Sequence, residues 1–389
     1  MSKTEIPSIR FRGFDDAWEQ RKLGDVVKEI TRNDPESKAP IMMITANNGF
    51  IEQSERYAFN NAGESLKKYI LLKKGELAYN HGASKLRPYG SCFALTTAEN
   101  ARIPFVYHCF SAENQNAEFM SIELNGAEIE NQLRKIVSSG ARMDGLLNIS
   151  FDEYTSVSVI LPGTEEQDRI ADFFRHLDNL ITLHQRKFEK LTSVKKSMLE
   201  KMFPQNGSSY PEIRFKGFTD PWEQRKLGDI ADIVGGGTPS TGNQSYWDGD
   251  IDWYAPAEIA DQIYANSSQK KITGLGYENS SAKMLPPGTV LFTSRAGIGK
   301  TAILTRKGCT NQGFQSIVPH RGELDSYFIF SRTEELKRYG ELVGAGSTFV
   351  EVSGKQMAVM VLMMPPTMRE QQTIGGFFQQ LDHLITLHQ

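Results

Sequence analysis

Cysteine is scarce in this sequence. The 389 residues contain only Cys92, Cys109 and Cys309, and no C-x-x-C pair. An odd and sparse set of this kind is typical of reduced, buried thiols in a cytoplasm and not of a disulfide framework. The histidines show no spacing that would suit metal ligation. The composition therefore predicts neither disulfides nor a metal site, and it favours a cytoplasmic protein.

Long apolar runs and strong net charge are also missing. No stretch of about 18 apolar residues could cross a bilayer. The first residues, MSKTEIPSIR, show no signal-peptide pattern. We therefore expect no membrane segment. The net charge is −3, which argues against a chain that binds polyanions over its whole surface.

Catalytic signatures are absent as well. The nearest match is SRAGIGKT at 294–301, which has the Gly299, Lys300 and Thr301 of a phosphate-binding loop but Ser294 at its first position. The following AILTRKG favours a strand, whereas phosphate binding needs a helix N-terminus. The sequence holds no nucleophile elbow, zinc-protease motif, kinase set or amino-methyltransferase loop. We expect no catalytic residue and no cofactor bound by this chain.

What the sequence does contain is a duplicated frame. Segment A, IRFRGFDDAWEQRKLGD at 9–25, recurs at 213–229 with 14 of 17 positions identical. Segment B, EQDRIADFFRHLDNLITLHQ at 166–185, recurs at 370–389 with 13 of 20 positions identical. Both duplications have an offset of 204 residues. The chain therefore consists of two repeats, and its length suits two or more domains.

The regions between these segments, roughly 26–160 and 230–364, are similar in length but differ in sequence. They share faint landmarks, such as KKGELAYN at 73–80 and PPGTVLFT at 286–293, where a turn leads into a strand. Short β-like runs recur, as in YTSVSVILP at 154–162, and glycine, proline and asparagine interrupt them. We expect two variable domains of mixed α/β class, each with a curved sheet.

A long helix is predicted to follow the first variable domain. Proline and glycine are absent from Glu165 to Met202, and Thr164 with the acidic residues after it resembles a helix start. We expect a first variable domain over 1–163, a spacer helix over 164–203, a second variable domain over 204–365 and a shorter spacer helix over 366–389. At 1.5 Å per residue the first helix would be about 55 Å long.

Apolar residues recur along these helices with a period of seven, which is typical of a coiled coil. We expect the two helices to pair antiparallel, with histidines that fix the register. The alternative is that each helix packs only on its own domain. The second helix is shorter by roughly 17 residues, so the distal part of the first would lack an intramolecular partner. The predicted seam residues are Ile170, Leu177, His184, Leu191, Leu384 and His388.

Basic residues cluster at equivalent places in the two variable regions, at and after the shared landmark. The second cluster, between 283 and 307, contains no acidic residue. Basic side chains on loops with aromatic neighbours suit contacts with DNA phosphates and bases, although a solvated lysine face is the alternative. The candidate DNA-binding residues are Lys67, Lys68, Lys85, Arg87, Lys283, Arg295, Lys300 and Arg306.

The duplicated motifs RF.GF...WE.RKLGD and EQ..I..FF..LD.LITLHQ, flanking two dissimilar domains, resemble the specificity subunit of a type I restriction-modification enzyme. The resemblance implies a DNA-binding, non-catalytic subunit of a phage-defence complex. Each variable domain would be a target recognition domain that reads one half of a bipartite sequence. The helices would form an antiparallel coiled coil that spaces the two domains.

The same resemblance implies partners. Two modification subunits would bind S-adenosylmethionine and methylate adenines in double-stranded DNA. Two restriction subunits with motor and nuclease domains would use ATP and Mg²⁺. A stand-alone DNA-binding module and a coiled-coil protein scaffold remain the alternative functions.

Overall fold

The computed structural model describes residues 4–5, 7–46, 48–56, 63–137, 146–295, 297–345 and 351–389. Contacts divide the chain into an N-terminal unit, Met1–Ile181, and a C-terminal unit, Thr182–Gln389. Both units combine sheets with helices, so the mixed α/β class is confirmed. The division falls inside a long helix, α5 (Thr164–Lys201), which is also confirmed. Among the described residues, no helix combines the length and apolarity that crossing a bilayer requires.

The N-terminal unit contains several small sheets built from short strands. Segment A supplies the central strand of a three-stranded sheet with the order β1 (Thr4–Glu5), β2 (Trp18–Lys22), β11 (Ser158–Leu161). The largest sheet has the order β3 (Val27–Glu29), β10 (His108–Ala112), β7 (Leu77–Asn80), β8 (Ser91–Ala94). Two further pairs join β4 (Met42–Thr45) to β5 (Gly49–Glu52) and β6 (Ile70–Lys73) to β9 (Asn100–Ile103).

Short helices surround these sheets. Their bounds are α1 (Gln53–Arg56), α2 (Ala117–Leu124), α3 (Ala127–Ile136) and α4 (Phe151–Thr155), with 3-10 turns η1 (Leu23–Asp25) and η2 (Gly63–Lys68). Asn116 caps α2 by accepting a hydrogen bond from the backbone of Phe119. Ser150 and Glu153 form a reciprocal capping box at α4. These caps fix the helices that border the start of α5.

The C-terminal unit also contains a strand from segment A, β12 (Glu223–Lys226), which pairs with β21 (Val361–Met364). Its largest sheet has the order β13 (Ala231–Gly235), β20 (Gln315–Pro319), β17 (Val290–Phe292), β18 (Thr301–Leu304), β15 (Tyr264–Ala265). A third sheet has the order β16 (Lys270–Ile272), β14 (Trp247–Tyr254), β19 (Cys309–Thr310). The helices are α6 (Leu227–Ile230), α7 (Gly274–Glu278), α8 (Ser326–Ser331), α9 (Thr333–Gly344), α10 (Gly354–Ala358) and α11 (Met368–Leu387), with turns η3 (Gln244–Tyr246) and η4 (Pro256–Glu258).

The two variable regions share a sheet despite their different sequences. The order β3-β10-β7-β8 in the first matches β13-β20-β17-β18 in the second. The landmark turns fall at equivalent points of this sheet. Gly75 and Gly288 both adopt positive φ, which glycine tolerates, and β7 and β17 follow directly. The regions therefore differ in what surrounds a common four-stranded core.

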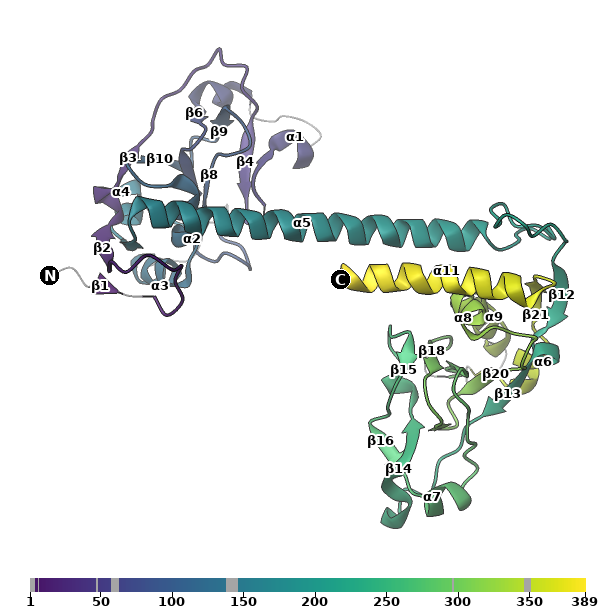
Figure 1. Cartoon of the computed structure of the whole chain (residues 1–389). Coiled ribbons are helices and arrows are strands. Elements are labelled where there is room, and N and C mark those ends of the chain that lie inside the picture. The colour runs from purple at the N-terminus through teal and green to yellow at the C-terminus, as the bar shows by residue number, and fades with distance from the viewer. Residues whose placement is uncertain are drawn as a thin grey trace. The chain divides into compact units, whose positions relative to one another are not determined.

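Within the C-terminal unit, the last part of α5 packs antiparallel on α11 (Figure 1). Lys195 Nζ lies 2.5 Å from Asp382 Oδ1. Beyond it along the chain, Phe203 shares a buried cluster with Phe378, which lies nearer the start of α11. The expectation that the distal part of α5 would lack a partner is therefore wrong. In an antiparallel pair the end of one helix lies beside the start of the other, so this part of α5 meets the first turns of α11.

Candidate nucleic-acid interface

Each repeat joins segment A to segment B through a latch of one arginine, one tryptophan and one glutamate. In the first latch, Arg10 donates through Nε and Nη2 to the two carboxylate oxygens of Glu166, both at 2.7 Å. Trp18 Nε1 donates to the same carboxylate at 3.2 Å. Glu166 is only 1 % exposed. A bidentate charge-assisted pair with a third donor satisfies a carboxylate that burial would otherwise destabilise.

The second latch joins the equivalent three residues in a similar geometry. Arg214 Nε and Nη2 donate to Glu370 at 2.7 and 2.9 Å, and Trp222 Nε1 donates at 3.2 Å. The hydrogen bonds that Arg214 donates to the Glu370 carboxylate raise the pKa of the Arg214 guanidinium. The partners lie 156 residues apart in each repeat. Identical latches therefore fix two different domains to the starts of their helices.

The residue after each latch glutamate adds a second connection. Gln167 Oε1 accepts a hydrogen bond from the backbone N–H of Asn116, and Gln371 Oε1 accepts one from Asp325. Asn116 and Asp325 are the N-caps of α2 and α8. Each segment B is thus tied both to its segment A and to one helix of the variable domain. A domain held at two points has a defined orientation on its own helix.

The structure distributes the predicted seam residues among different environments. Ile170 packs against the core of the N-terminal unit, so the start of α5 does pack on its own domain. Leu191 is half-buried, whereas Leu177 and Leu384 are exposed.

The two predicted seam histidines lie in contact within the C-terminal unit. His388 Nδ1 lies 2.8 Å from His184 Nδ1, so one ring donates a hydrogen bond and the other accepts it. The rings are equivalent in the repeats and meet where α11 ends. Within this unit they mark the point from which the two helices run side by side toward Lys195 and Asp382.

The predicted basic residues of the second variable region do not form one cluster. Arg295 and Lys300 belong to the loop between β17 and β18. Lys283 and Arg306 lie toward the opposite end of this hairpin, where the segment before β17 bridges the turn after β18. The strands between the two ends span about 10 Å at 3.3 Å per residue. The acid-free run therefore supplies two separate basic sites.

Several of these side chains already have partners. Arg306 Nε lies 2.6 Å from Asp252 Oδ2, and Arg295 Nη1 lies 3.9 Å from Glu351. Burial acts to raise the pKa of Asp252, but hydrogen bonds from Ser268 and the pair with Arg306 outweigh burial and keep the pKa low. Arg306 therefore has a structural role beside any contact with DNA.

The loop that resembles a phosphate-binding motif has a different fold. Lys300 donates its backbone N–H to Thr293 Oγ1, which in turn donates to Gly297 O. Thr301 then begins β18 and not a helix. This geometry lacks the helix N-terminus on which nucleotide phosphates bind. The Lys300 side chain is exposed, so it is available for another anion.

In the N-terminal unit the candidates also separate. Lys67 and Lys68 end the η2 turn, whereas Lys85 and Arg87 lie in the loop between β7 and β8. Arg87 Nη1 donates to the backbone oxygen of Asn125 at the end of α2, which binds the guanidinium to its own domain. Lys85 and Lys68 are exposed.

Sequence reasoning missed the latch and the acidic partner of Arg306. In both cases the residues in contact are far apart in the sequence, so no short segment of the sequence reveals the contact. The exact repetition of arginine, tryptophan and glutamate at one offset was the available signal for the latch. In the described ranges, no group of three or more His, Cys, Asp or Glu side chains could hold a metal ion.

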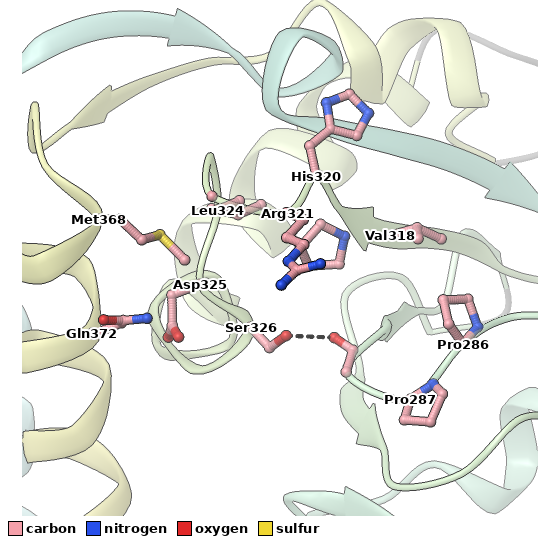
Figure 2. A pocket seen from close by; sticks show the side chains of 13 residues that line it. Pro286, Pro287, Val318, His320, Arg321, Leu324, Asp325, Ser326, Met368 and Gln372 are labelled. Atoms are coloured by element: carbon pink, nitrogen blue, oxygen red, sulfur yellow. Dashed lines mark hydrogen bonds between the residues drawn. The ribbon is translucent and has the colours of Figure 1, made fainter.

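A cavity of about 460 Å³ in the C-terminal unit lies between the turn before β17, the end of β20 and the starts of α8 and α11 (Figure 2). Ser326 Oγ donates to Gly288 O across it, and Asp325 caps α8. His320 pairs with Asp232. These polar groups hold elements together, so the cavity is a structural junction that does not resemble a catalytic centre.

Comparison with known families gives a clear result for the second repeat. Residues 219–389 match the family model described as the type I restriction modification DNA specificity domain. The MjaIX specificity subunit of Methanocaldococcus jannaschii is 36 % identical over 167 residues, which cover 42 % of this chain and 38 % of that relative. The MjaX specificity subunit of the same organism is 26 % identical and matches 62 % of this chain and 56 % of that relative. The chain thus spans less than two thirds of either relative.

Two other similar proteins match over greater lengths. The HindI specificity subunit of Haemophilus influenzae is 20 % identical, with 85 % of this chain and 86 % of that relative covered. A type I restriction-modification S subunit from M. genitalium superimposes with a TM-score of 0.56 at 12 % identity, covering 97 % of this chain and 92 % of that one. At this identity the match shows a shared fold.

Proposed function

Because residues 219–389 belong to the family of type I restriction modification DNA specificity domains, we propose that the whole chain is the DNA sequence-recognition subunit of such a complex. The single observation that extends the proposal from the second repeat to the first is the duplicated latch. The same three residue types, at the same offset and with similar distances, join segment A to segment B in both units. A common frame that holds two different domains suits a protein that reads two different half-sites.

In this function each variable domain reads one half of a bipartite target. The shared four-stranded sheet is the scaffold, and the loops that differ between the repeats carry the specificity. Exposed lysines such as Lys85, Lys283 and Lys300 suit contacts with phosphates, whereas Arg295 suits a base edge through its planar donors. Contacts of the first kind position the protein, and contacts of the second kind select the sequence.

We assign the helices two roles. The antiparallel pair of α5 and α11 acts as a coiled coil that spaces the two domains, and its outer surface docks modification subunits. The chain itself has no catalytic role. S-adenosylmethionine is bound by the modification subunits, and ATP and Mg²⁺ are used by the restriction subunits.

The experiment that tests the function is methylome sequencing of a host that expresses this chain with its modification subunit. We expect adenine methylation at one bipartite sequence. Exchange of residues 26–160 for the matching region of a relative should change one half of that sequence and leave the other half intact. Exchange of residues 230–364 is the matched control and should change only the other half. Methylation that loses both halves after either exchange would contradict independent domains.

The alternatives give different outcomes. A stand-alone DNA-binding module would bind a defined sequence but direct no methylation by the modification subunit. A protein scaffold would form complexes without sequence-selective binding to DNA. The variants Arg295→Ala and Lys300→Ala separate these cases further. The first should cost about 1–3 kcal/mol of discrimination at one base position, and the second should reduce the salt dependence of binding at every sequence.

A further inference from the structure

The sheet common to both repeats has one end at which two loops of each repeat lack acidic residues. One loop joins β7 to β8, or β17 to β18, and the other leads into β10 or β20. These loops are 81–90 and 104–107 in the first repeat, and 293–300 and 311–314 in the second. The opposite end of the first sheet carries Glu76, Glu99 and Glu113. DNA is a polyanion, so we expect it to approach the acid-free end.

In the first repeat, a tight turn between β7 and β8 forms part of this end. The Ser84 N–H donates to Arg87 O, and the Arg87 N–H donates to Ser84 Oγ. The Arg87 guanidinium also donates to Asn125 O, which fixes the turn to the end of α2. The two central residues of the turn are Lys85 and Leu86, and Leu86 is 60 % exposed. The turn therefore holds a cation and an apolar side chain at its tip.

A second turn, directly before β10, lies at the same end. The Tyr107 N–H donates to Pro104 O at 3.0 Å. The central residues Phe105 and Val106 are 50 % and 37 % exposed. His81 Nε2 lies 2.8 Å from Val106 O, which connects this turn to the chain that leaves β7. Two connected, hydrogen-bonded turns thus present three apolar side chains to water.

The second repeat has hydrogen-bonding side chains in the equivalent loops. Arg295 follows β17, and Gln312 precedes β20. Thr238 Oγ1 donates to Gln312 Oε1, which orients the amide of this exposed side chain. Arg295 is half-buried, and its Nη1 lies 3.9 Å from Glu351, beyond the length of a direct hydrogen bond. Arginine and glutamine recognise guanine and adenine through paired hydrogen bonds, so equivalent loops of the two domains carry different chemistry.

We propose that Leu86 and Phe105 read thymine in the half-site of the first domain, through apolar contact with C5 methyl groups in the major groove. The thymine methyl distinguishes A·T pairs in that groove and is the group that apolar side chains recognise there. Lys85, which is beside Leu86 at the turn tip, binds a neighbouring phosphate. The inference rests on the proposed function and names the chemistry by which the first domain selects its half-site.

A protein partner is a poorer occupant of these turn tips. A surface that docks the same partner twice would keep the same chemistry in both repeats. The tips instead differ between the repeats, with Leu86 and Phe105 in the first and Arg295 and Gln312 in the second. A difference of this kind is expected of side chains that read two different half-sites.

The test uses the chain in complex with its modification subunit and a labelled DNA duplex that contains the target found by methylome sequencing. Exchange of residues 26–160 identifies the half-site of the first domain. Deoxyuridine then replaces thymidine in this half-site, one position at a time, because uracil lacks only the methyl group. The partner of the methylated adenine is left unchanged. By fluorescence anisotropy, we expect at least one replacement to weaken binding about fourfold, as for one buried methyl group.

Variants of the chain connect this effect to the two side chains. Leu86→Ala and Phe105→Ala should each weaken binding to the unmodified duplex about tenfold. Each should also abolish the effect of deoxyuridine at the position that the side chain contacts, so the two losses do not add. Ile9→Ala, which changes an exposed apolar residue of segment A, is the matched control and should keep the full deoxyuridine effect. Circular dichroism checks that each variant is folded.

Three results would overturn the inference. One is a first half-site that contains no thymine apart from the partner of the methylated adenine. Another is a deoxyuridine series without effect, which together with weaker binding by Phe105→Ala would make the ring a wedge between bases. The third is unchanged DNA affinity in both variants, which would assign the tips to a protein partner. Each of these leaves methylation at a bipartite target intact, whereas absence of any such target would contradict the proposed function itself.

Discussion

Phe174 and Phe378 occupy the same position of segment B, in helices of nearly the same sequence, yet only Phe378 is buried. The difference arises from Phe203, which covers Phe378 and has no counterpart over Phe174 among the described residues. The comparison shows that the repeated sequence encodes a capacity to pair. Burial of a given residue then depends on whether an antiparallel segment lies against it.

A second difference lies beside these two phenylalanines. Arg332 and Glu123 hold equivalent places, because Arg332 Nη1 donates to Met363 O and Glu123 Oε1 accepts from Ile160 N–H on the matching strand. Arg332 stacks on Phe203, with its guanidinium carbon 5.4 Å from the ring centroid. In the first repeat, burial raises the pKa of Glu123. The equivalent places in the two repeats therefore hold groups of different charge.

The largest contrast is expected from truncating the two phenylalanines. Phe378→Ala removes a fully buried ring and should lower the free energy of unfolding of the C-terminal unit by about 3–5 kcal/mol. Phe174→Ala should change stability by less than about 1 kcal/mol, because much of the ring already contacts water. Urea denaturation of both variants checks the pair. Equal losses would show that Phe174 is also buried in solution.

The latches offer the next contrast. Glu370→Ala leaves the partly buried Arg214 guanidinium and the buried Trp222 indole N–H without their acceptor. We expect a loss of about 3 kcal/mol of stability. Glu166→Ala should cost less, because Trp18 is only half-buried and its N–H can bind water. Thermal denaturation of both variants measures the difference, and a larger loss for Glu166→Ala would contradict this account.

A smaller effect is expected at the aspartates. Asp382→Ala removes the partner of Lys195 and the acceptor of the Tyr327 hydroxyl, which donates to it at 2.8 Å. The cost should be about 1–3 kcal/mol. Asp178→Ala should stay within about 0.5 kcal/mol, as is usual for an exposed site. If the two losses were equal, Asp178 would already have a partner in the isolated chain.

The smallest effect concerns pH. Partial desolvation, and then His184 and Lys187, lower the pKa of His388. The folded chain therefore binds this proton less readily than the unfolded chain does. The contribution to stability is complete above the unfolded pKa of about 6.5 and is lost as the pH falls below it. Urea denaturation at pH 7.5 and 5.5 should show this loss, and His388→Gln should reduce it.

Local patterns in the sequence were sufficient for the helices and the frame. The absence of proline and glycine from Glu165 to Met202 predicted α5, and the landmark turns predicted β7 and β17. Periodicity also predicted paired helices, but it left the last part of α5 without a partner. In an antiparallel pair, this part of α5 lies beside the first turns of α11. The direction of the pair places residues 186–203 on α11.

The rest could not be predicted, because it depends on distant residues. Arg10 and Glu166 are 156 residues apart, and so are Arg214 and Glu370. The four-stranded sheet common to both variable regions could not be recognised in the sequence, because different apolar residues can fill equivalent positions of a core. The basic run of 283–307 looks continuous in sequence, but a hairpin folds its parts to opposite ends. Which loop side chains touch bases remains a prediction.

The duplicated latch also has a genetic consequence. An unequal crossover between the two copies of segment B would delete 204 residues and join the first domain to the second helix. The product would still contain a complete latch, because Arg10 and Trp18 would meet Glu370, whose sequence surroundings match those of Glu166. The same holds for crossovers between genes that share these segments. Whole domains can therefore be exchanged between alleles without new contacts having to evolve at the junction.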